Sequence, residues 1–260
     1  MENLLRTLIR ALRLRADAEA YGIQEFIRSA GSLARETDVV LDAGAGDCPY
    51  KIYFMHTIYE SCDITQNSAG THTFLCDVQS IPRPDNTYNV VISTQVLDDV
   101  PYPQRVIDEC FRILKPGGSL FLTAPQGWGI HNAPYHFFGF TCYGLKLLFD
   151  NAGFETLFIK PRGGIFWYLG RRIRGLPTYL YKQDVAGPDG ESSAREQFKA
   201  GLNASLLKPL YFLAYPVCRY VIPLICFYLD RIDRRQDYTL GYACHCVKQI
   251  PPHGTVETDR

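Results

Sequence analysis

The chain has 260 residues with 27 basic and 27 acidic side chains, so its formal net charge at pH 7 is zero. A chain of this length can bury a substantial core and fits one α/β domain with an elaboration. The balanced charge excludes a global positive field that would recruit nucleic acid, so electrostatic interactions have to be local. Nine cysteines occur without a C-x-x-C pair, which predicts reduced thiols in a cytoplasmic protein rather than a disulfide framework.

The first predicted element is a basic amphipathic helix within an N-terminal helical segment, residues 1–36. Apolar residues recur at helical spacing, and arginines interrupt any continuous apolar run. We favour a helix that packs on a sheet, and the alternative is a helix that contacts a membrane surface. The pattern consists of Leu4, Leu5, Leu8, Ile9 and Leu12 with Arg6, Arg10, Arg13 and Arg15.

Short apolar runs that alternate with helical patterns predict a Rossmann-like, doubly wound α/β sheet with helices on both faces. Residues 37–160 plus 238–250 are expected to form this domain. One helix is predicted from Pro103 to Leu114, and another between the capping residue Thr141 and Gly153. The predicted strands are residues 38–42, 58–62, 73–76, 88–93, 119–123, 154–159 and 238–247.

The last predicted strand contains two cysteines that flank a histidine. Because side chains alternate along a strand, Cys244 and Cys246 share one face and His245 takes the other. Two thiols on one face without further ligands are typical of packed side chains. No metal site is therefore predicted.

Residues 161–237 interrupt the strand pattern, which predicts a functional insertion or a cap. The stretch 160–182 is basic and aromatic. The stretch 206–229 is almost wholly apolar, but Arg219 and three prolines oppose insertion, so we do not predict a transmembrane span. One interpretation is a kinked helical cap on the sheet edge or on a partner subunit. The other is an interfacial segment that brings the active site to an anionic bilayer at the inner face of the membrane. A surface loop is predicted for 184–193 and a flexible tail for 251–260.

Glycines and acidic residues stand where the predicted strands end, which is where an open parallel sheet holds its ligand. Gly44 and Gly46 follow the first strand and let backbone amides approach a ligand closely. Asp63 ends the second strand, where a carboxylate can accept both hydroxyls of a ribose. Asp77 ends the third strand, where it can accept a hydrogen bond from an adenine amino group. A dinucleotide enzyme needs a third glycine at the position where this chain has Pro49. The crevice therefore suits a nucleoside without phosphates. Pro49 also disfavours a nicotinamide oxidoreductase.

Taken in order, these motifs resemble the class I S-adenosylmethionine-dependent methyltransferases, in the small-molecule, type 11-like branch. Residues 39–46 look like the first motif of that family, 59–64 like its ribose-binding strand and 75–78 like its adenine-contacting turn. Residues 88–118 match the signature around the fourth strand, except that Asp99 stands where the family often has histidine. The resemblance implies S-adenosyl-L-methionine as the cofactor and a seven-stranded sheet whose last strand is antiparallel. It implies cofactor contacts from Asp42, Gly44, Ala45, Gly46, Asp63, Ile64, Asp77, Val78, Thr94 and Gln95.

The loop after the fifth strand, residues 126–138, carries His131 and His136 among aromatic residues. Methyl transfer from a sulfonium is an in-line displacement that needs positioning more than covalent help. A base helps when the acceptor is a hydroxyl or a protonated amine. We therefore predict that one of these histidines orients or deprotonates the acceptor; the alternative is a polar lid residue.

The sequence thus predicts an enzyme that methylates a small-molecule, glycan-precursor or lipid-linked acceptor. A non-catalytic nucleoside-binding or scaffold protein with the same fold is the alternative. A nucleic-acid methyltransferase is disfavoured by the zero net charge and by Ser93-Thr94-Gln95, which stands in place of a base-flipping motif.

Overall fold

The computed structural model describes residues 2–181 and 211–250. The chain divides into two compact units. The helical unit comprises Met1–Ile23, Gly127–His136 and Pro161–Leu240, and the sheet unit comprises Gln24–Gln126, Phe137–Lys160 and Gly241–Arg260. The surface loop predicted for 184–193 and the tail predicted for 251–260 lie outside the described residues.

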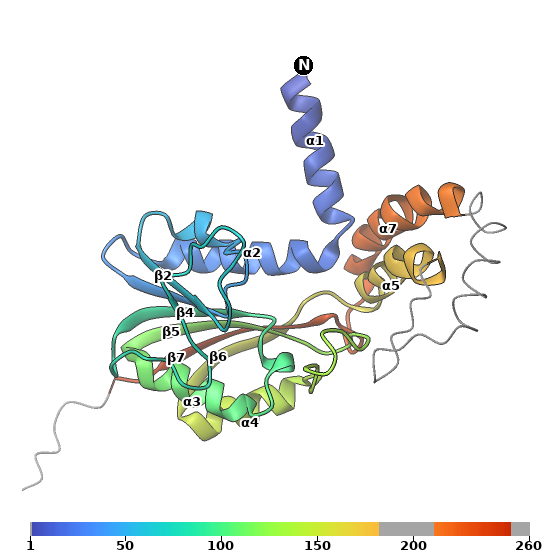
Figure 1. The fold of residues 1–260 in the computed structure, drawn as a ribbon. Coiled ribbons are helices and arrows are strands. Elements are labelled where there is room, and N and C mark those ends of the chain that lie inside the picture. The colour runs from blue at the N-terminus through green and yellow to red at the C-terminus, as the bar shows by residue number, and fades with distance from the viewer. Residues whose placement is uncertain (1, 182–210, 251–260) are drawn as a thin grey trace, which may run out of the picture. The chain divides into compact units, whose positions relative to one another are not determined.

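The sheet unit is built on a seven-stranded sheet in the order β3-β2-β1-β4-β5-β7-β6 (Figure 1). β1 pairs in parallel with β2 and β4, and β4 pairs in parallel with β5. β7 runs antiparallel to β5. The predicted doubly wound sheet with an antiparallel last strand is therefore confirmed. The strands are β1 Val39–Ala43, β2 Ile58–Asp63, β3 Phe74–Leu75, β4 Tyr88–Thr94, β5 Leu114–Pro125, β6 Phe154–Pro161 and β7 Gly241–Lys248.

Two strands differ from their predicted bounds. β3 pairs only at Phe74 and Leu75, opposite Cys62 and Asp63, so it is shorter than the predicted 73–76. β5 begins at Leu114, which pairs with Tyr88. Residues 115–118, which were not predicted as part of a strand, form a bulge inside β5, because the register to β4 shifts before Ser119 resumes the pairing. Gly117 in that bulge has φ +78, which explains a glycine there.

Helices cover both faces of the sheet. α3 (Pro103–Ile113) and α4 (Cys142–Ala152) lie on one face, and α2 (Ala18–Leu33) lies on the other (Figure 1). Pro103 occupies the first turn of α3 as predicted. Thr141 caps α4 by accepting the N–H of Gly144, and Gly153 ends the helix at φ 88, so both predicted capping residues are confirmed. Short 3₁₀ turns are found at Lys51–Phe54, Leu97–Asp99 and Asp230–Ile232.

The cysteines and the histidine of β7 lie on opposite faces of the strand. Cys244 and Cys246 are fully buried in the main hydrophobic core, and neither forms a disulfide. The imidazole of His245 stacks on Phe121, with the ring centroids 4.1 Å apart. The prediction that the two thiols are packed side chains on one face is confirmed.

The helical unit contains three main helices in its described part. They are α1 (Glu2–Arg15), α5 (Ile165–Tyr181) and one continuous helix from Tyr211 to Ile232. The last of these contains a π-helical turn at Val217–Val221 and continues as α7 (Ile222–Leu229). We refer to residues 211–232 as the apolar helix. It is the one helix in the described part of the chain that is long and apolar enough to cross a membrane, on length and composition only.

Prolines explain the irregularity of the apolar helix. Pro223 has no N–H to donate to the carbonyl of Arg219, four residues earlier. That carbonyl instead accepts the guanidinium of Arg174 from α5, at 3.1 Å. Arg174 also binds the carbonyl of Ala16 and forms an ion pair with Asp17 at 2.8 Å. One buried arginine therefore joins α5, the apolar helix and the junction between α1 and α2.

Two carboxylates, of buried Asp230 and half-buried Asp233, fix the start of α5. The carboxylate of Asp230 accepts the N–H groups of Gly164 and Trp167, and Asp233 accepts that of Ile165. These are backbone donors that the first turn of a helix leaves unpaired. The caps explain why α5 begins directly after β6.

α1 belongs to the helical unit, and the favoured packing of this helix on a sheet stays a prediction. Leu5 is 57% exposed and Leu8 is 53% exposed, so the N-terminal part of the apolar stripe of α1 is not covered. The amphipathic pattern was correctly interpreted as a helix, but it does not identify the surface that the stripe meets.

Candidate cofactor and acceptor sites

The glycine turn after β1 forms the floor of the candidate cofactor site. Gly44 has φ +74, and a Cβ there would lie 2.4 Å from Cγ2 of Val96. The N–H groups of Gly44 and Ala45 both donate to the carbonyl of Cys62, at 3.0 Å. Backbone conformation and close approach therefore both require glycine at position 44.

Gly46 links this turn to the end of β2. Its N–H donates to Oδ2 of Asp63 at 2.9 Å, and Oδ1 of Asp63 accepts the N–H of Ile64 at 2.7 Å. Gly46 has φ +52, and a Cβ built on it meets no atom within 4 Å. The turn thus presents open space beside a carboxylate that both backbone amides orient.

Asp42 is a buried carboxyl at the end of β1. Its Oδ2 accepts the hydroxyl of Tyr59 at 2.8 Å, and its buried Oδ1 has no hydrogen-bond partner among the described residues. Burial raises the pKa of Asp42 to about 7, although the hydrogen bond from Tyr59 opposes that rise. A buried acceptor without a donor fits a ligand that carries an ammonium group.

Tyr59 was missed by sequence reasoning. It lies on β2 in register with Val40 and donates to Asp42 from the neighbouring strand. Burial and the negative charge of Asp42 raise the pKa of Tyr59, so it remains a donor. Tyr59 stands four residues before Asp63, so both side chains lie on the same face of β2. This spacing could have indicated Tyr59 from the sequence.

Asn67 was missed as well. Its Nδ2 donates to the carbonyl of Gly46 at 3.4 Å and to Oγ1 of Thr71 at 2.9 Å. Its Oδ1 accepts the N–H of Thr71 at 3.0 Å. The segment after β2 is thereby tied to the glycine turn. Because the contact joins residues 46 and 67 across a loop, no local pattern indicated it.

The turn after β3 carries Asp77 and Val78. The Asp77 carboxylate is exposed, and within the described part of the chain its hydrogen bonds go to the backbone N–H and side-chain amide of Gln79. Val78 is buried and belongs to the core. The structure places both at the carboxyl end of β3 as predicted, while the adenine contact expected of Asp77 stays a prediction.

The end of β4 holds an unusual backbone conformation. Gln95 has φ 56, which a residue with a side chain seldom adopts. Its N–H and its side-chain amide both donate to Thr123 of β5, at 3.0 Å in each case. Thr94, which pairs with Thr123, is half-buried beside it. Such conformations concentrate at functional sites, and this one lies at the carboxyl edge of the sheet.

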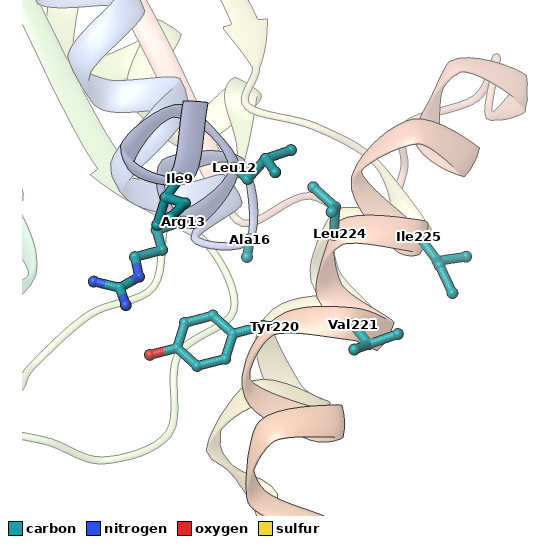
Figure 2. A pocket seen from close by; sticks show the side chains of 8 residues that line it. All are labelled: Ile9, Leu12, Arg13, Ala16, Tyr220, Val221, Leu224 and Ile225. Atoms are coloured by element: carbon teal, nitrogen blue, oxygen red, sulfur yellow. The ribbon is translucent and has the colours of Figure 1, made fainter. Parts of the chain in front are cut away.

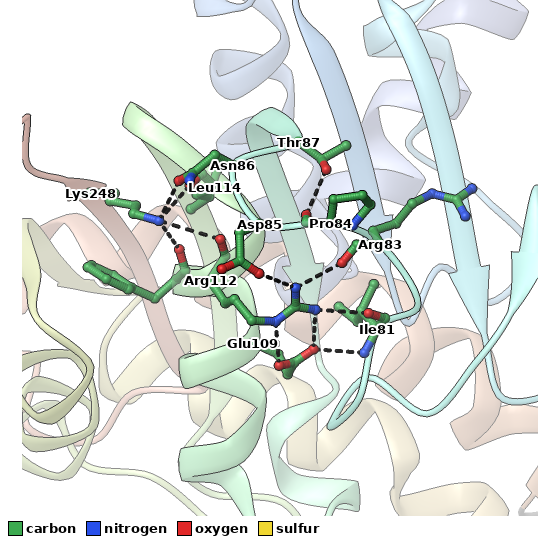
Figure 3. A network of polar contacts seen from close by, with 11 residues as sticks. Ile81, Arg83, Pro84, Asp85, Asn86, Thr87, Glu109, Arg112, Leu114 and Lys248 are labelled. Carbon is green, nitrogen blue, oxygen red and sulfur yellow. Dashed lines mark hydrogen bonds and ion pairs between the residues drawn. The ribbon is translucent and has the colours of Figure 1, made fainter.

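A polar network fixes the connection between β3 and β4 (Figure 3). Arg112 of α3 binds both oxygens of Glu109 and pairs with Asp85 at 2.7 Å. It also donates to the carbonyls of Ile81 and Arg83. Glu109 and Asp85 raise the pKa of Arg112, and Arg112 lowers the pKa of Glu109. The network holds the loop that follows Asp77 and Val78.

The predicted acceptor loop divides between the two units. Its residues Gly127–His136 belong to the helical unit. There the indole N–H of Trp128 donates to Glu19 at 2.8 Å, and the guanidinium of Arg171 lies 4.2 Å from the Trp128 ring centroid. Arg171 also pairs with Glu19 at 3.2 Å. A tryptophan held between a buried carboxylate and a cation anchors this loop.

The two predicted catalytic histidines are brought together in this loop. The ring centroids of His131 and His136 are 4.2 Å apart, and that of Trp128 lies 5.6 Å from His131. Nδ1 of His131 is 3.1 Å from the carbonyl oxygen of Gly129. Nε2 of His136 is buried and has no hydrogen-bond partner among the described residues. Paired imidazoles can position or accept a proton, but their catalytic role stays a prediction.

The fold belongs to the Rossmann-like class, and the carboxyl edge of its sheet is the candidate nucleoside site. Residues 41–122 match the family described as a methyltransferase domain, and these are the residues that form the glycine turn, Asp63, Asp77 and the end of β4. This match, with the relatives below, supports a class I S-adenosylmethionine-dependent methyltransferase domain in that part of the chain.

Three curated relatives share the matched region. The chain is 33% identical over 111 residues to an arsenite methyltransferase from Halobacterium salinarum, covering 38% of this chain and 28% of the relative. It is 29% identical over 167 residues to 2-methyl-6-phytyl-1,4-hydroquinone methyltransferase 1 from Oryza sativa, covering 60% and 47%. It is 29% identical over 96 residues to the ubiquinone biosynthesis O-methyltransferase of Klebsiella pneumoniae, covering 36% of each. The chain thus spans less than half the length of each of these relatives.

Solved structures agree on the fold. A protein of Galdieria sulphuraria assigned to the sarcosine dimethylglycine methyltransferases superposes with a TM-score of 0.51 at 17% identity, over 87% of this chain and 84% of that one. The [4+2]-cyclase SpnF superposes with a TM-score of 0.50, also at 17% identity, over 88% and 81%. At this identity the likeness concerns the fold alone, and a fold does not determine the reaction.

Proposed function

We propose that this protein transfers a methyl group from S-adenosylmethionine to a small-molecule acceptor. The observation that carries the proposal is the arrangement at the sheet edge: Gly46 donates to Asp63 beside open space, and a fully buried carboxyl, Asp42, retains an acceptor oxygen without a donor. These groups fit an unphosphorylated nucleoside that carries an ammonium group.

Each residue of the edge has a distinct task in this proposal. Asp63, oriented by two backbone amides, would hold the ribose hydroxyls, and Asp42 would hold the ammonium group. Asp77 and Val78 would border the base, and Thr94 and Gln95 would line the site at the end of β4. S-adenosylmethionine, when bound, supplies a methyl group already activated on a sulfonium. The remaining work of the protein is to orient the acceptor and exclude water.

The histidine pair supplies the proposed acceptor chemistry. A hydroxyl or an ammonium acceptor has to lose a proton, and His131 or His136 is the proposed recipient. The anchoring of Trp128 by Glu19 and Arg171 keeps this pair in place within the helical unit.

An acceptor that carries a long apolar tail is the class we favour. Two of the relatives are named for phytyl-hydroquinone and ubiquinone methylation, and a phytyl group is a long hydrocarbon chain. The helical unit exposes many large apolar side chains, including Phe212 at 71% and Leu213 at 74%. We place the reaction in the cytoplasm, at the inner face of the membrane.

Profiling with an isotope-labelled methyl donor tests the proposal. Purified protein is incubated with the labelled donor and with separate lipid and water-soluble extracts of the host cell. Label in an apolar extract supports the favoured acceptor class, and label in the soluble extract alone assigns a polar acceptor instead. Binding of the donor without transfer to either extract would favour the alternative, a non-catalytic nucleoside-binding or scaffold protein.

A further inference from the structure

The helical unit has an apolar pocket of about 360 Å³ between α1 and the apolar helix. A volume of this size lies within the range of small-molecule pockets. Figure 2 shows the lining side chains projecting from the two facing helices. From α1 come Ile9, Leu12, Arg13 and Ala16, and from the apolar helix come Tyr220, Val221, Leu224 and Ile225. Arg13 is the one charged residue of this lining, and with the hydroxyl of Tyr220 it gives an otherwise hydrocarbon wall a polar end.

The surface around the pocket is apolar on both helices. Within the apolar helix, only 17% of the most apolar 18-residue stretch is buried. Val221 is 51% exposed and Ile225 53% exposed beside the pocket, and Leu5 and Leu8 continue the apolar surface along α1. Single exposed leucines are ordinary, but a continuous apolar surface on two neighbouring helices indicates an interaction site.

The arginines of α1 indicate what kind of partner this surface binds. Arg6, Arg10 and Arg13 are spaced by four and three residues, so they form one row beside the apolar stripe of α1. The only acidic residue of α1 is Glu2, and residues 211–229 contain none. An apolar stripe bordered by arginines is typical of a helix that lies in the interface of an anionic bilayer.

We propose that α1 and the apolar helix form a docking site for an anionic phospholipid bilayer, with the pocket between them holding one hydrocarbon chain. The apolar residues of both helices enter the acyl boundary, and the arginine row of α1 contacts lipid phosphates. The site deepens the proposed membrane-side location but does not depend on methyl transfer.

Vesicle co-sedimentation with the full chain tests this site. One vesicle set contains equal parts of phosphatidylglycerol and phosphatidylcholine, and the other contains phosphatidylcholine only. We expect binding to the anionic set at low ionic strength and release as salt is raised. A basic residue near an anionic surface contributes roughly fivefold in partitioning, so R10Q combined with R13Q should weaken binding about 30-fold.

Matched variants separate docking from general effects. L8Q and L12Q should weaken binding to the anionic vesicles. R28Q on α2 and L147Q on α4 alter comparably exposed residues of the sheet unit and should leave it unchanged. The heat of cofactor binding, measured on the same variants, reports on the sheet unit, so loss of docking and loss of the proposed methyltransferase function are distinguishable.

Three results would overturn the proposal. Equal or absent binding to both vesicle sets would exclude recognition of anionic lipid. Self-association that L8Q abolishes, with no binding to vesicles, would assign the apolar surface to a second copy of the chain. Binding that resists salt and yields only to detergent would assign the apolar helix as a membrane span.

Discussion

The backbone N–H of Gly46 donates to the carboxylate of Asp63 at 2.9 Å, across 17 residues of sequence. This bond joins the turn after β1 to the end of β2, the two places where a nucleoside is expected to be held. Because Ile64 binds the second oxygen of Asp63, the carboxylate has a fixed direction before any ligand arrives.

Replacement of Asp63 tests that orientation. Asp63→Asn keeps the size of the side chain but removes its charge, and hydrogen bonds to a charged group contribute about 1.5–3 kcal/mol. We therefore expect a 10- to 100-fold weaker affinity for S-adenosylmethionine, measured by calorimetry. The exposed Asp108→Asn on α3 serves as the control and should bind normally. Equal affinity in the two variants would rule out Asp63 as a ligand residue.

Gly44 and Gly46 should respond differently to alanine. Both have positive φ, which costs an alanine roughly 1–2 kcal/mol. At Gly44 a Cβ also lies 2.4 Å from Val96, so G44A should destabilise the fold by more than this amount. At Gly46 no atom lies within 4 Å, so G46A should fold and lose cofactor affinity instead. Urea unfolding and calorimetry measure the two effects, and the reverse order of stabilities would contradict the account.

The raised pKa of Asp42 predicts that the free energy of unfolding depends on pH. Its pKa is raised from 3.8 to about 7 by burial, so between these values the folded state binds a proton that the unfolded state has lost. The free energy of unfolding should fall as pH rises through this window and level off above it. Asp42→Asn cannot ionise and removes this decline, which amounts to up to roughly 4 kcal/mol. Parallel stability curves for the two proteins from pH 4 to pH 8 would show that Asp42 titrates normally.

Glu19 is expected to hold the acceptor loop. It is buried and binds both Trp128 and Arg171, so Glu19→Gln leaves a partly buried cation without its carboxylate. We expect a loss of about 2–3 kcal/mol in unfolding free energy and a shift in tryptophan emission. Glu25→Gln, which alters an exposed ion pair with Arg28, should change stability by less than about 0.5 kcal/mol. Similar losses in both variants would argue against a special role of Glu19.

Replacement of His131 or His136 by alanine is expected to lower the rate of methyl transfer. If His131 or His136 accepts the proton of the acceptor, its replacement by alanine lowers the rate about 10²- to 10⁴-fold while cofactor affinity stays unchanged. His56→Ala alters an exposed histidine that contacts the carbonyl of Ala34 and should leave the rate unaffected. Unchanged rates in both loop variants would mean that the pair is a polar lid.

Much of the sheet edge could be predicted because it depends on local patterns. An apolar run followed by glycine or aspartate identifies both a buried parallel strand and its carboxyl end, so the positions of Asp42, Gly44, Gly46 and Asp63 at the ends of β1 and β2 could be predicted. β3 was predicted too long, because the apolar run at 73–76 does not show that only Phe74 and Leu75 find partners.

Contacts between distant segments could not be predicted in the same way. Trp128 and Glu19 are 109 residues apart, and nothing in the local spacing of either one indicates the other. The surface that α1 meets could not be predicted for a related reason, because an amphipathic pattern defines a stripe without its partner. Leu5 and Leu8 belong to this stripe, and both are exposed in the structure.

Calorimetric titration of the folded 260-residue chain with S-adenosylmethionine and with S-adenosylhomocysteine tests the central claim most directly. We predict saturable heat with both ligands and a dissociation constant in the micromolar range, weakened by Asp63→Asn. No heat with either ligand would contradict the nucleoside site at the carboxyl edge and the methyltransferase function proposed from it.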